Sequence, residues 1–254
     1  MNLGYYLETV ERGLGAKVEL VDDWSYIYDD LLEETVRVQF LGQGFEKTAY
    51  LNEDQDTVYV ITENEYPDQS LQALSYICKN SLNQGSDPNP HLPCVIYVGY
   101  DDRFVGNEIE IYKMPYYQQF NSPELDAPPL EQKPLIEYEA LIGAVQQAKA
   151  DNWVQRKGSV ISGIIEYLPS SHLRLKEALN SMLEVEQMGY DKYDFDLTQD
   201  NVGVDADGNL VLFDVFYIEQ DSGMLPSELM EAYKVELNQK PTLLSTQEWI
   251  NKET

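Results

Sequence analysis

Hydrophobic and polar residues alternate along several short stretches in the first half of the chain. These stretches are VRVQFL, KTAYL, TVYVIT, CVIYVGY and NEIEIYKM, at 36–41, 47–51, 57–62, 94–100 and 107–114. Because successive side chains of a strand point to opposite faces of a sheet, this period of two predicts five strands. Apolar residues recur at helical spacing over 68–82, which predicts one helix after the third strand.

The segment before the first of these strands has a different pattern. Residues 1–35 are expected to form a helical N-terminal extension, because apolar residues follow a helical spacing there. The residues concerned are Trp24, Ile27, Tyr28, Leu31 and Leu32.

Four of the twelve prolines lie within 121–134, which marks a boundary between two parts of the chain. We expect a strand-rich part at 36–122 and a helical part at 123–254. Three helical patterns follow the prolines, LIEYEALIGAVQQAKA, VISGIIEYL and SHLRLKEALNSMLEVEQM. The helical part also contains a hairpin, VGVDADGNLVLF, and the last 40 or so residues again have helical character.

The hairpin brings two polar side chains together. With Asp207-Gly208 as a two-residue turn, the numbers of paired residues add up to 415, so Asn201 lies opposite Asp214. Directly opposed residues have Cβ atoms about 5 Å apart. An amide oxygen and a carboxylate at this distance suit Mg²⁺, which takes few protein ligands and adds phosphate oxygens. The alternative is an acidic hairpin in which the asparagine caps a strand end.

The chain is strongly acidic, with 45 acidic and 17 basic residues and a formal net charge of −28. This charge argues against direct binding of nucleic acid or of an anionic membrane, and it favours bound cations or basic partners. Residues 181–220 alone hold ten acids and one lysine. A solvated acidic surface is one interpretation. Mimicry of nucleic acid, directed at a basic nucleic-acid-binding protein, is another.

The cysteines and histidines suggest no further site. Cys78 and Cys94 fit neither a zinc spacing nor a disulfide framework, which is typical of a reducing cytoplasm. The N-terminus lacks the basic start and apolar core of a signal peptide. His91 and His172 are isolated in the sequence and receive no role.

The spacing around the hairpin resembles that of protein kinases, in which an Asp, an Asn and a second Asp follow one another at fixed intervals. Asp196 precedes Asn201 by five residues, and Asn201 precedes Asp214 by 13. The resemblance implies a catalytic base at Asp196 and Mg²⁺ ligands at Asn201 and Asp214. Two departures are plain: residues 194–195 are Asp-Phe where kinases have His-Arg, and 215–216 are Val-Phe instead of Phe-Gly. Aminoglycoside kinases, choline kinases and small kinase-like proteins of bacteriophages are similar in lacking the His-Arg pair.

The same family has a glycine-rich phosphate loop, and FLGQGFEKTAY resembles it through Gly42 and Gly44. The lysine of the third strand is missing, since Thr62 stands near its position. Lys47 resembles the relocated lysine in the glycine-rich loop of with-no-lysine kinases, which implies a phosphate contact. Ala49, two residues on, would then cover adenine. The alternative for Lys47 is an ordinary hairpin lysine in water.

The resemblance implies an α+β, two-lobed protein-kinase-like fold with an antiparallel-sheet N-lobe and a minimal helical C-lobe. A backbone group near Met114 would hold adenine, with ATP and Mg²⁺ as cofactors. The function implied is phosphoryl transfer to a protein in the cytoplasm, that of the host cell if the protein is phage-encoded. The alternative is an inactive pseudokinase, or an acidic DNA mimic, that binds and inhibits a basic partner protein.

Overall fold

The computed structural model describes 18–21, 24–43, 47–64, 69–101, 108–119, 132–152, 158–188, 193–217, 233–234 and 241–253. Eight strands form one antiparallel sheet in the order β1-β2-β3-β4-β5-β7-β6, with β13 paired to β3. Their bounds are β1 Val18–Val21, β2 Trp24–Asp29, β3 Glu34–Gln43, β4 Lys47–Asn52, β5 Thr57–Asn64, β6 Ile96–Asp101, β7 Glu108–Pro115 and β13 Tyr233–Lys234.

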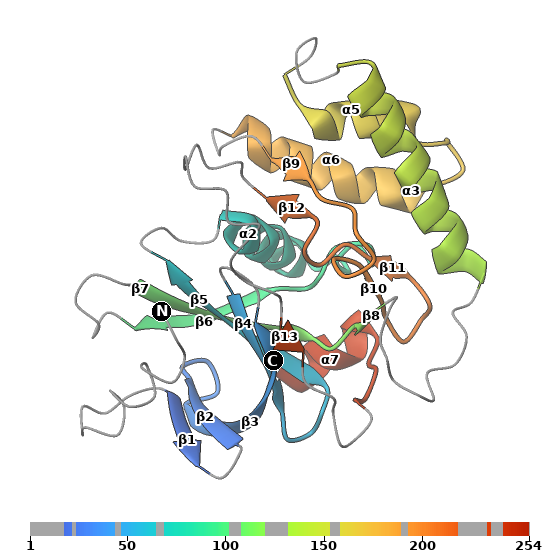
Figure 1. Ribbon diagram of the computed structural model, residues 1–254. Coiled ribbons are helices and arrows are strands. Elements are labelled where there is room, and N and C mark those ends of the chain that lie inside the picture. The colour runs from blue at the N-terminus through green and yellow to red at the C-terminus, as the bar shows by residue number, and fades with distance from the viewer. Residues whose placement is uncertain are drawn as a thin grey trace.

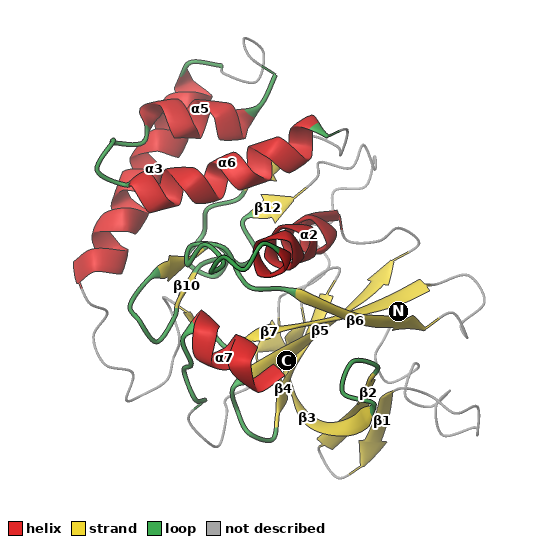
Figure 2. Ribbon diagram, turned by 180° about the vertical axis from the view of Figure 1, so that it is seen from behind, coloured by secondary structure: helices red, strands yellow, loops and turns green. Residues whose placement is uncertain are grey.

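The helices lie mostly on one side of this sheet. They are α2 Gln69–Asn83, α3 Gln132–Ala150, α5 Val160–Tyr167, α6 Leu173–Gln187 and α7 Thr246–Glu253. Helix α2 lies between the sheet and the group formed by α3, α5 and α6, whereas α7 packs apart from that group, beside the sheet (Figure 1). Figure 2 shows the same arrangement from behind. We call the large sheet with α2 the N-lobe, and α3, α5 and α6 with the two small sheets described next the C-lobe.

Two small sheets complete the C-lobe. One joins β8 Gln118–Gln119, β10 Gly203–Val204 and β11 Leu210–Val211, and the other pairs β9 Asp194–Phe195 with β12 Phe216–Tyr217. The expected α+β class with an antiparallel-sheet lobe and a small helical lobe is thus confirmed. None of the described helices is long and apolar enough to cross a membrane.

The sheet separates two cores. Along β7, Tyr112 and Met114 face the core that α2 and the C-lobe share, and Ile109 and Ile111 face a smaller core on the opposite side. Ile27 of β2 belongs to that smaller core and is fully buried. The period of two predicted for β7 therefore reflects a strand whose two faces are both buried, one in each core.

The helix expected in the N-terminal extension is wrong for the described residues, because Trp24–Asp29 is a strand. Burial alternates there, with Ile27 and Asp29 buried and Tyr28 exposed. The helical spacing was produced by Leu31 and Leu32, which are exposed in the turn after the strand. Asp29 Oδ1 accepts hydrogen bonds from the backbone amides of both leucines and so stabilises the turn. Residues 1–17 of the extension lie outside the described part of the chain.

The end of the chain returns to the N-lobe. Trp249 of α7 is fully buried and donates from its indole nitrogen to Thr57 Oγ1, 2.9 Å away. Lys113 Nζ on β7 contacts Asp29 Oδ2 at 2.9 Å and Glu253 Oε2 of α7 at 2.7 Å. An ion triad with no exposed atoms on the lysine therefore joins β2, β7 and the last helix.

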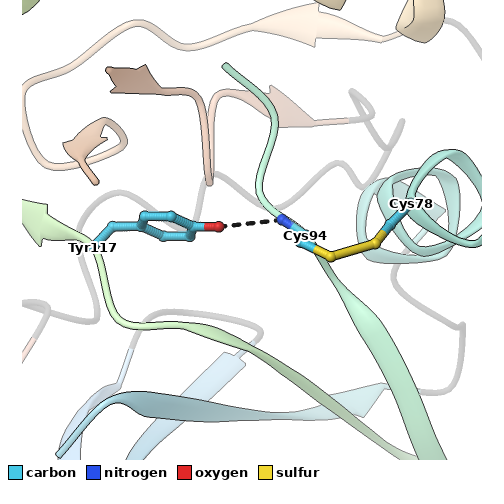
Figure 3. The surroundings of a disulfide bond; sticks show 3 residues. All are labelled: Cys78, Cys94 and Tyr117. Carbon is cyan, nitrogen blue, oxygen red and sulfur yellow. Dashed lines mark hydrogen bonds between the residues drawn. A yellow bond between two sulfur atoms is a disulfide. The ribbon is translucent and has the colours of Figure 1, made fainter. Parts of the chain in front are cut away.

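The two cysteines are joined, contrary to the expectation that they form no disulfide. Cys78 of α2 and Cys94, just before β6, are bonded, with their Cα atoms 5.4 Å apart. They pack against Trp249 and Ile250 of α7. Figure 3 shows the Tyr117 hydroxyl pointing at the Cys94 backbone amide, from which it accepts a hydrogen bond of 3.2 Å. The separation of 16 positions between the cysteines hid this pairing, since only the packing of α2 on the sheet brings them together.

Candidate functional site

The hairpin that carries the acidic residues has a different register from the expected one. Gly203 pairs with Val211 and Val204 with Leu210, so paired numbers add up to 414 instead of 415. The loop has three residues and ends at Gly208, whose φ of +73° is the left-handed conformation that a three-residue hairpin loop requires. Asp205 Oδ1 accepts from the backbone amides of Asp207 and Asn209 and stabilises this longer loop.

Asn201 and Asp214 are neighbours despite the changed register. The backbone amide of Asp214 donates to the carbonyl of Asn201 over 3.1 Å. The Nδ2 of the Asn201 side chain donates to both the carbonyl and Oδ2 of Asp196, each at 3.1 Å. The backbone amide of Asp196 in turn donates to the carbonyl of Val215. The structure therefore brings together the three residues selected from their spacing.

Lys47 reaches this group from the other lobe. Its Nζ lies 2.6 Å from Asp214 Oδ1, and the two residues are 167 positions apart in the chain. The lysine side chain is 21% exposed and that of Asp214 is 43% exposed, so the pair is accessible to solvent and to small solutes. Lys47 points across the interface between the lobes, toward the carboxylate for which a metal role was expected.

The remaining nucleotide candidates lie on the strands beside Lys47. Gly42 pairs with Ala49, next to an irregularity in the ladder between Phe40 and Gly42. Ala49 and Met114 pack in the same core, which faces the C-lobe, and Met114 is buried. Gly44 lies outside the described residues. Gly42 and Ala49 thus lie on the two paired strands β3 and β4, of which β4 carries Lys47, and Met114 lies on β7, with β5 between β4 and β7.

The donor atoms near Asp214 fit a lightly ligated magnesium ion. Because Nδ2 of Asn201 makes both bonds to Asp196, its Oδ1 is the atom that can ligate a cation, and Asp214 supplies carboxylate oxygens. In the described part of the chain, no three His, Cys, Asp or Glu residues form a group that could hold a metal. Hard oxygen ligands in small number are what Mg²⁺ uses when phosphate and water complete its shell.

The strand position of the missing lysine is occupied by a buried threonine. Thr62 pairs directly with Lys47 on one side and with Glu110 of β7 on the other. Glu110 Oε1 accepts a hydrogen bond of 3.2 Å from Nε2 of Gln72 on α2. Neither Glu110 nor Gln72 was selected from the sequence. Glu110 stands out only once the pairing of β4, β5 and β7 is known, and Gln72 only once α2 packs on that sheet.

His91, to which the sequence assigned no role, secures the hairpin. Its carbonyl accepts from the Leu212 amide, and its ring Nδ1 donates to the Leu210 carbonyl at 2.8 Å. The ring is buried, and its Nε2 faces Glu137 Oε1 of α3 at 4.0 Å. Burial lowers the pKa of His91, and the bond to Leu210 and the charge of Glu137 act in the opposite direction.

The hairpin also packs tightly against the segment after β7. A Cβ atom on Gly203 would lie 2.9 Å from Tyr117 Cβ and 3.2 Å from Phe213 Cε1. Tyr117 and Phe213 stack with their ring planes 10° apart. Because Phe213 directly precedes Asp214, this contact positions the metal-ligand candidate relative to the connection between the lobes.

Comparison with known proteins adds little to this geometry. No model of a protein family matches the chain, and no curated protein matches it. A solved structure that matches is the GDP and kanamycin complex of APH(2")-IIia, at 16% sequence identity, 84% coverage of this chain and 75% coverage of that chain. The TM-score is 0.29, which is too low to support an inference about fold or function. The fold and the candidate site therefore stand on the topology and on the contacts described above.

Proposed function

We propose that the protein is an ATP- and Mg²⁺-dependent phosphotransferase of the protein-kinase-like superfamily, with a protein as acceptor. The observation that carries this proposal is the contact between Lys47 and Asp214 across the two lobes. It joins a glycine-rich strand hairpin to the Asp–Asn–Asp loop, which are the two parts that phosphoryl transfer requires.

In this proposal each residue has a defined task. Lys47 binds phosphate oxygens and offsets their charge, while Asn201 and Asp214 hold Mg²⁺. The metal ion supplies further neutralisation of the phosphates. Asp196 accepts the proton of the acceptor hydroxyl as that oxygen bonds to the γ-phosphorus and the bond to the bridging oxygen of the nucleoside diphosphate breaks. The two bonds from Asn201 orient Asp196 for this step.

The adenine would lie between Ala49 and the backbone near Met114. Both residues belong to the core facing the C-lobe, Ala49 on the same strand as Lys47 and Met114 on β7. The net charge of −28 favours an acceptor or partner with a basic surface. A cytoplasmic location is part of the same proposal.

The test uses purified protein, γ-labelled ATP, Mg²⁺ and extract proteins as acceptors. Asp196→Asn is expected to lower labelling about 100-fold or more, since it removes the proton acceptor while preserving shape. Asp200→Asn is the matched control, because it makes the same change of charge four residues away on the same exposed loop. Equal labelling by the Asp196 and Asp200 variants would contradict the proposal.

A second function is an inactive kinase-like protein that binds a basic partner. It is favoured by the Asp-Phe sequence at 194–195, which replaces the His-Arg of active kinases, and by Thr62 at the lysine position. Its distinguishing result is capture of a basic protein that the Asp196→Ala/Asp214→Ala variant retains, with no thermal shift from ATP and Mg²⁺.

A further inference from the structure

Helix α2 has no charged tether to the sheet of the kind that active kinases use. In those proteins a strand lysine pairs with a helix glutamate, and the pair keeps the helix in its active position. Here the strand position holds Thr62, and Gln69–Asn83 contains neither aspartate nor glutamate. Lys47, which supplies the cation in the proposed site, contacts Asp214 of the C-lobe.

A tether of opposite polarity is present one strand further on. Glu110 of β7 receives a hydrogen bond from Gln72 Nε2 of α2 at its Oε1, and from the Tyr112 hydroxyl at its Oε2, over 3.2 Å and 2.8 Å. The carboxylate thus belongs to the sheet, and the donor belongs to the helix. Because both oxygens of Glu110 are bonded, its side chain is fixed in the orientation that meets Gln72.

Glu110 also lies in the same row of the sheet as Lys47. Lys47 pairs with Thr62, and Thr62 pairs with Glu110, so the three side chains are on one face. Two strand spacings, about 10 Å, separate the backbones of Lys47 and Glu110. The tether and the phosphate-binding cation are therefore two side chains of one row, with the small Thr62 between them.

The helix end held by this tether contacts one segment of the proposed site directly and the other through Tyr193. The carbonyl of Gln69, in the same turn as Gln72, accepts from the Tyr193 hydroxyl at 3.2 Å. The Tyr193 ring packs edge-on against Phe216, with centroids 6.4 Å apart. Tyr193 lies three residues before Asp196, and Phe216 lies two residues after Asp214. A chain of contacts therefore runs from this end of α2 to both segments.

We propose that Glu110 and Gln72 are positioning residues which replace the lysine–glutamate tether, so that α2 is held to the sheet without Lys47. The inference rests on the proposed phosphotransferase function. The carboxylate acts through α2 and Tyr193 on the placement of Asp196 and Asp214. Loss of the tether should consequently lower kcat more than it changes KM for ATP.

The test compares four variants of the full chain by steady-state kinetics. Gln72→Leu removes the donor and is expected to lower kcat about tenfold, with KM for ATP within about threefold of wild type. Gln72→Glu places two carboxylates face to face and should be impaired at pH 8 but partly recover at pH 6, where the pair shares a proton. Gln72→Glu/Glu110→Gln reverses the polarity and should return kcat to within about threefold of wild type. Asn83→Asp is the matched control, because it also changes an amide to a carboxylate on α2, at an exposed position, and it should behave as wild type.

The results separate this inference from the proposed function. If wild type transfers phosphate but the Gln72 variants keep full kcat, or the reversed pair is no better than Gln72→Glu alone, the inference is wrong. If wild type transfers no phosphate, the proposed function fails, and hydrogen exchange of the α2 amides then decides the tether. Faster exchange in Gln72→Leu, restored in the reversed pair, would support the tether, and unchanged exchange would overturn it.

Discussion

Replacing Lys113 by methionine should strongly destabilise the protein, because it removes the only cation of the buried triad. Both carboxylates of that triad are nearly or fully buried, with exposures of 0% for the Asp29 side chain and 6% for that of Glu253. Asp29 also accepts a hydrogen bond of 2.9 Å from the Tyr59 hydroxyl. Burial, and after it the charge of Asp29, raises the pKa of this tyrosine. The tyrosine therefore stays neutral: it adds no further negative charge, and a phenol supplies no positive charge to replace that of the lysine.

The magnitude follows from the burial of the pair. Removing one partner of a buried ion pair costs about 3–5 kcal/mol, because it leaves an uncompensated charge in a medium that solvates it poorly. For a protein of this length, 1 kcal/mol corresponds to a change in Tm of about 2–4 °C. Lys113→Met is thus expected to lower Tm by about 6–20 °C.

The assay is urea and thermal unfolding followed by circular dichroism. Lys252→Met is the matched control, since this α7 lysine also contacts two carboxylates, Asp54 and Asp56, but is 36% exposed. Its loss should cost less, about 1 kcal/mol, because Lys252 is partly solvated and the nearly buried Asp56 keeps hydrogen bonds from Asn52 and Thr57. In Lys113→Met/Glu253→Gln, one of the two unpaired charges is removed, which should restore part of the stability. Equal losses from Lys113→Met and Lys252→Met would refute the reasoning.

Three further predictions concern the packing around the site. Gly203→Ala should destabilise by about 1–3 kcal/mol in urea, since the added Cβ would lie 2.9 Å from Tyr117 Cβ, and an unchanged midpoint would contradict that close approach. Burial lowers the pKa of His91, so the unfolded chain binds the proton more readily than the folded one, and the free energy of unfolding falls as the pH drops below about 6.5. His91→Asn should reduce this loss of stability between pH 7 and 5.5, and an equal loss in the variant and wild type would argue against the role of His91. Reduction of the Cys78–Cys94 disulfide should lower the free energy of unfolding by about 3 kcal/mol for a closed loop of this length. A reductant should therefore lower the urea midpoint of wild type but not that of the Cys78→Ala/Cys94→Ala variant, and equal shifts in the two proteins would contradict this.

Local pattern was sufficient for most of the sheet. The strands β3 to β7 follow the alternation of the sequence, and the helix expected over 68–82 is Gln69–Asn83. The pattern misled at Trp24–Asp29, where two exposed leucines of the following turn completed an apparent helical repeat. Spacing alone cannot distinguish an apolar residue that is buried from one that a turn leaves in solvent.

The candidate site was predictable where it depends on short loops. A hairpin brings Asp196, Asn201 and Asp214 together. Their proximity does not depend on the expected register, since the pairing is shifted by one residue and the Asp214 amide still bonds to the Asn201 carbonyl. Long-range partners could not be read in the same way. The donation from Gln72 to Glu110 depends on how a helix packs on a sheet, which no local spacing encodes.

The central claim is that Lys47, Asn201 and Asp214 form a site for a nucleotide and Mg²⁺, and calorimetric titration with ATP tests it most directly. Titrations with and without Mg²⁺ are made on wild type, Lys47→Ala, Asp214→Asn and, as a control, the exposed α3 variant Lys149→Ala. The account predicts that wild type and the control bind ATP more tightly with Mg²⁺. Lys47→Ala should weaken binding about tenfold, and Asp214→Asn should abolish the effect of Mg²⁺. Absence of ATP binding by wild type, or equal affinity and Mg²⁺ dependence in all four proteins, would contradict it.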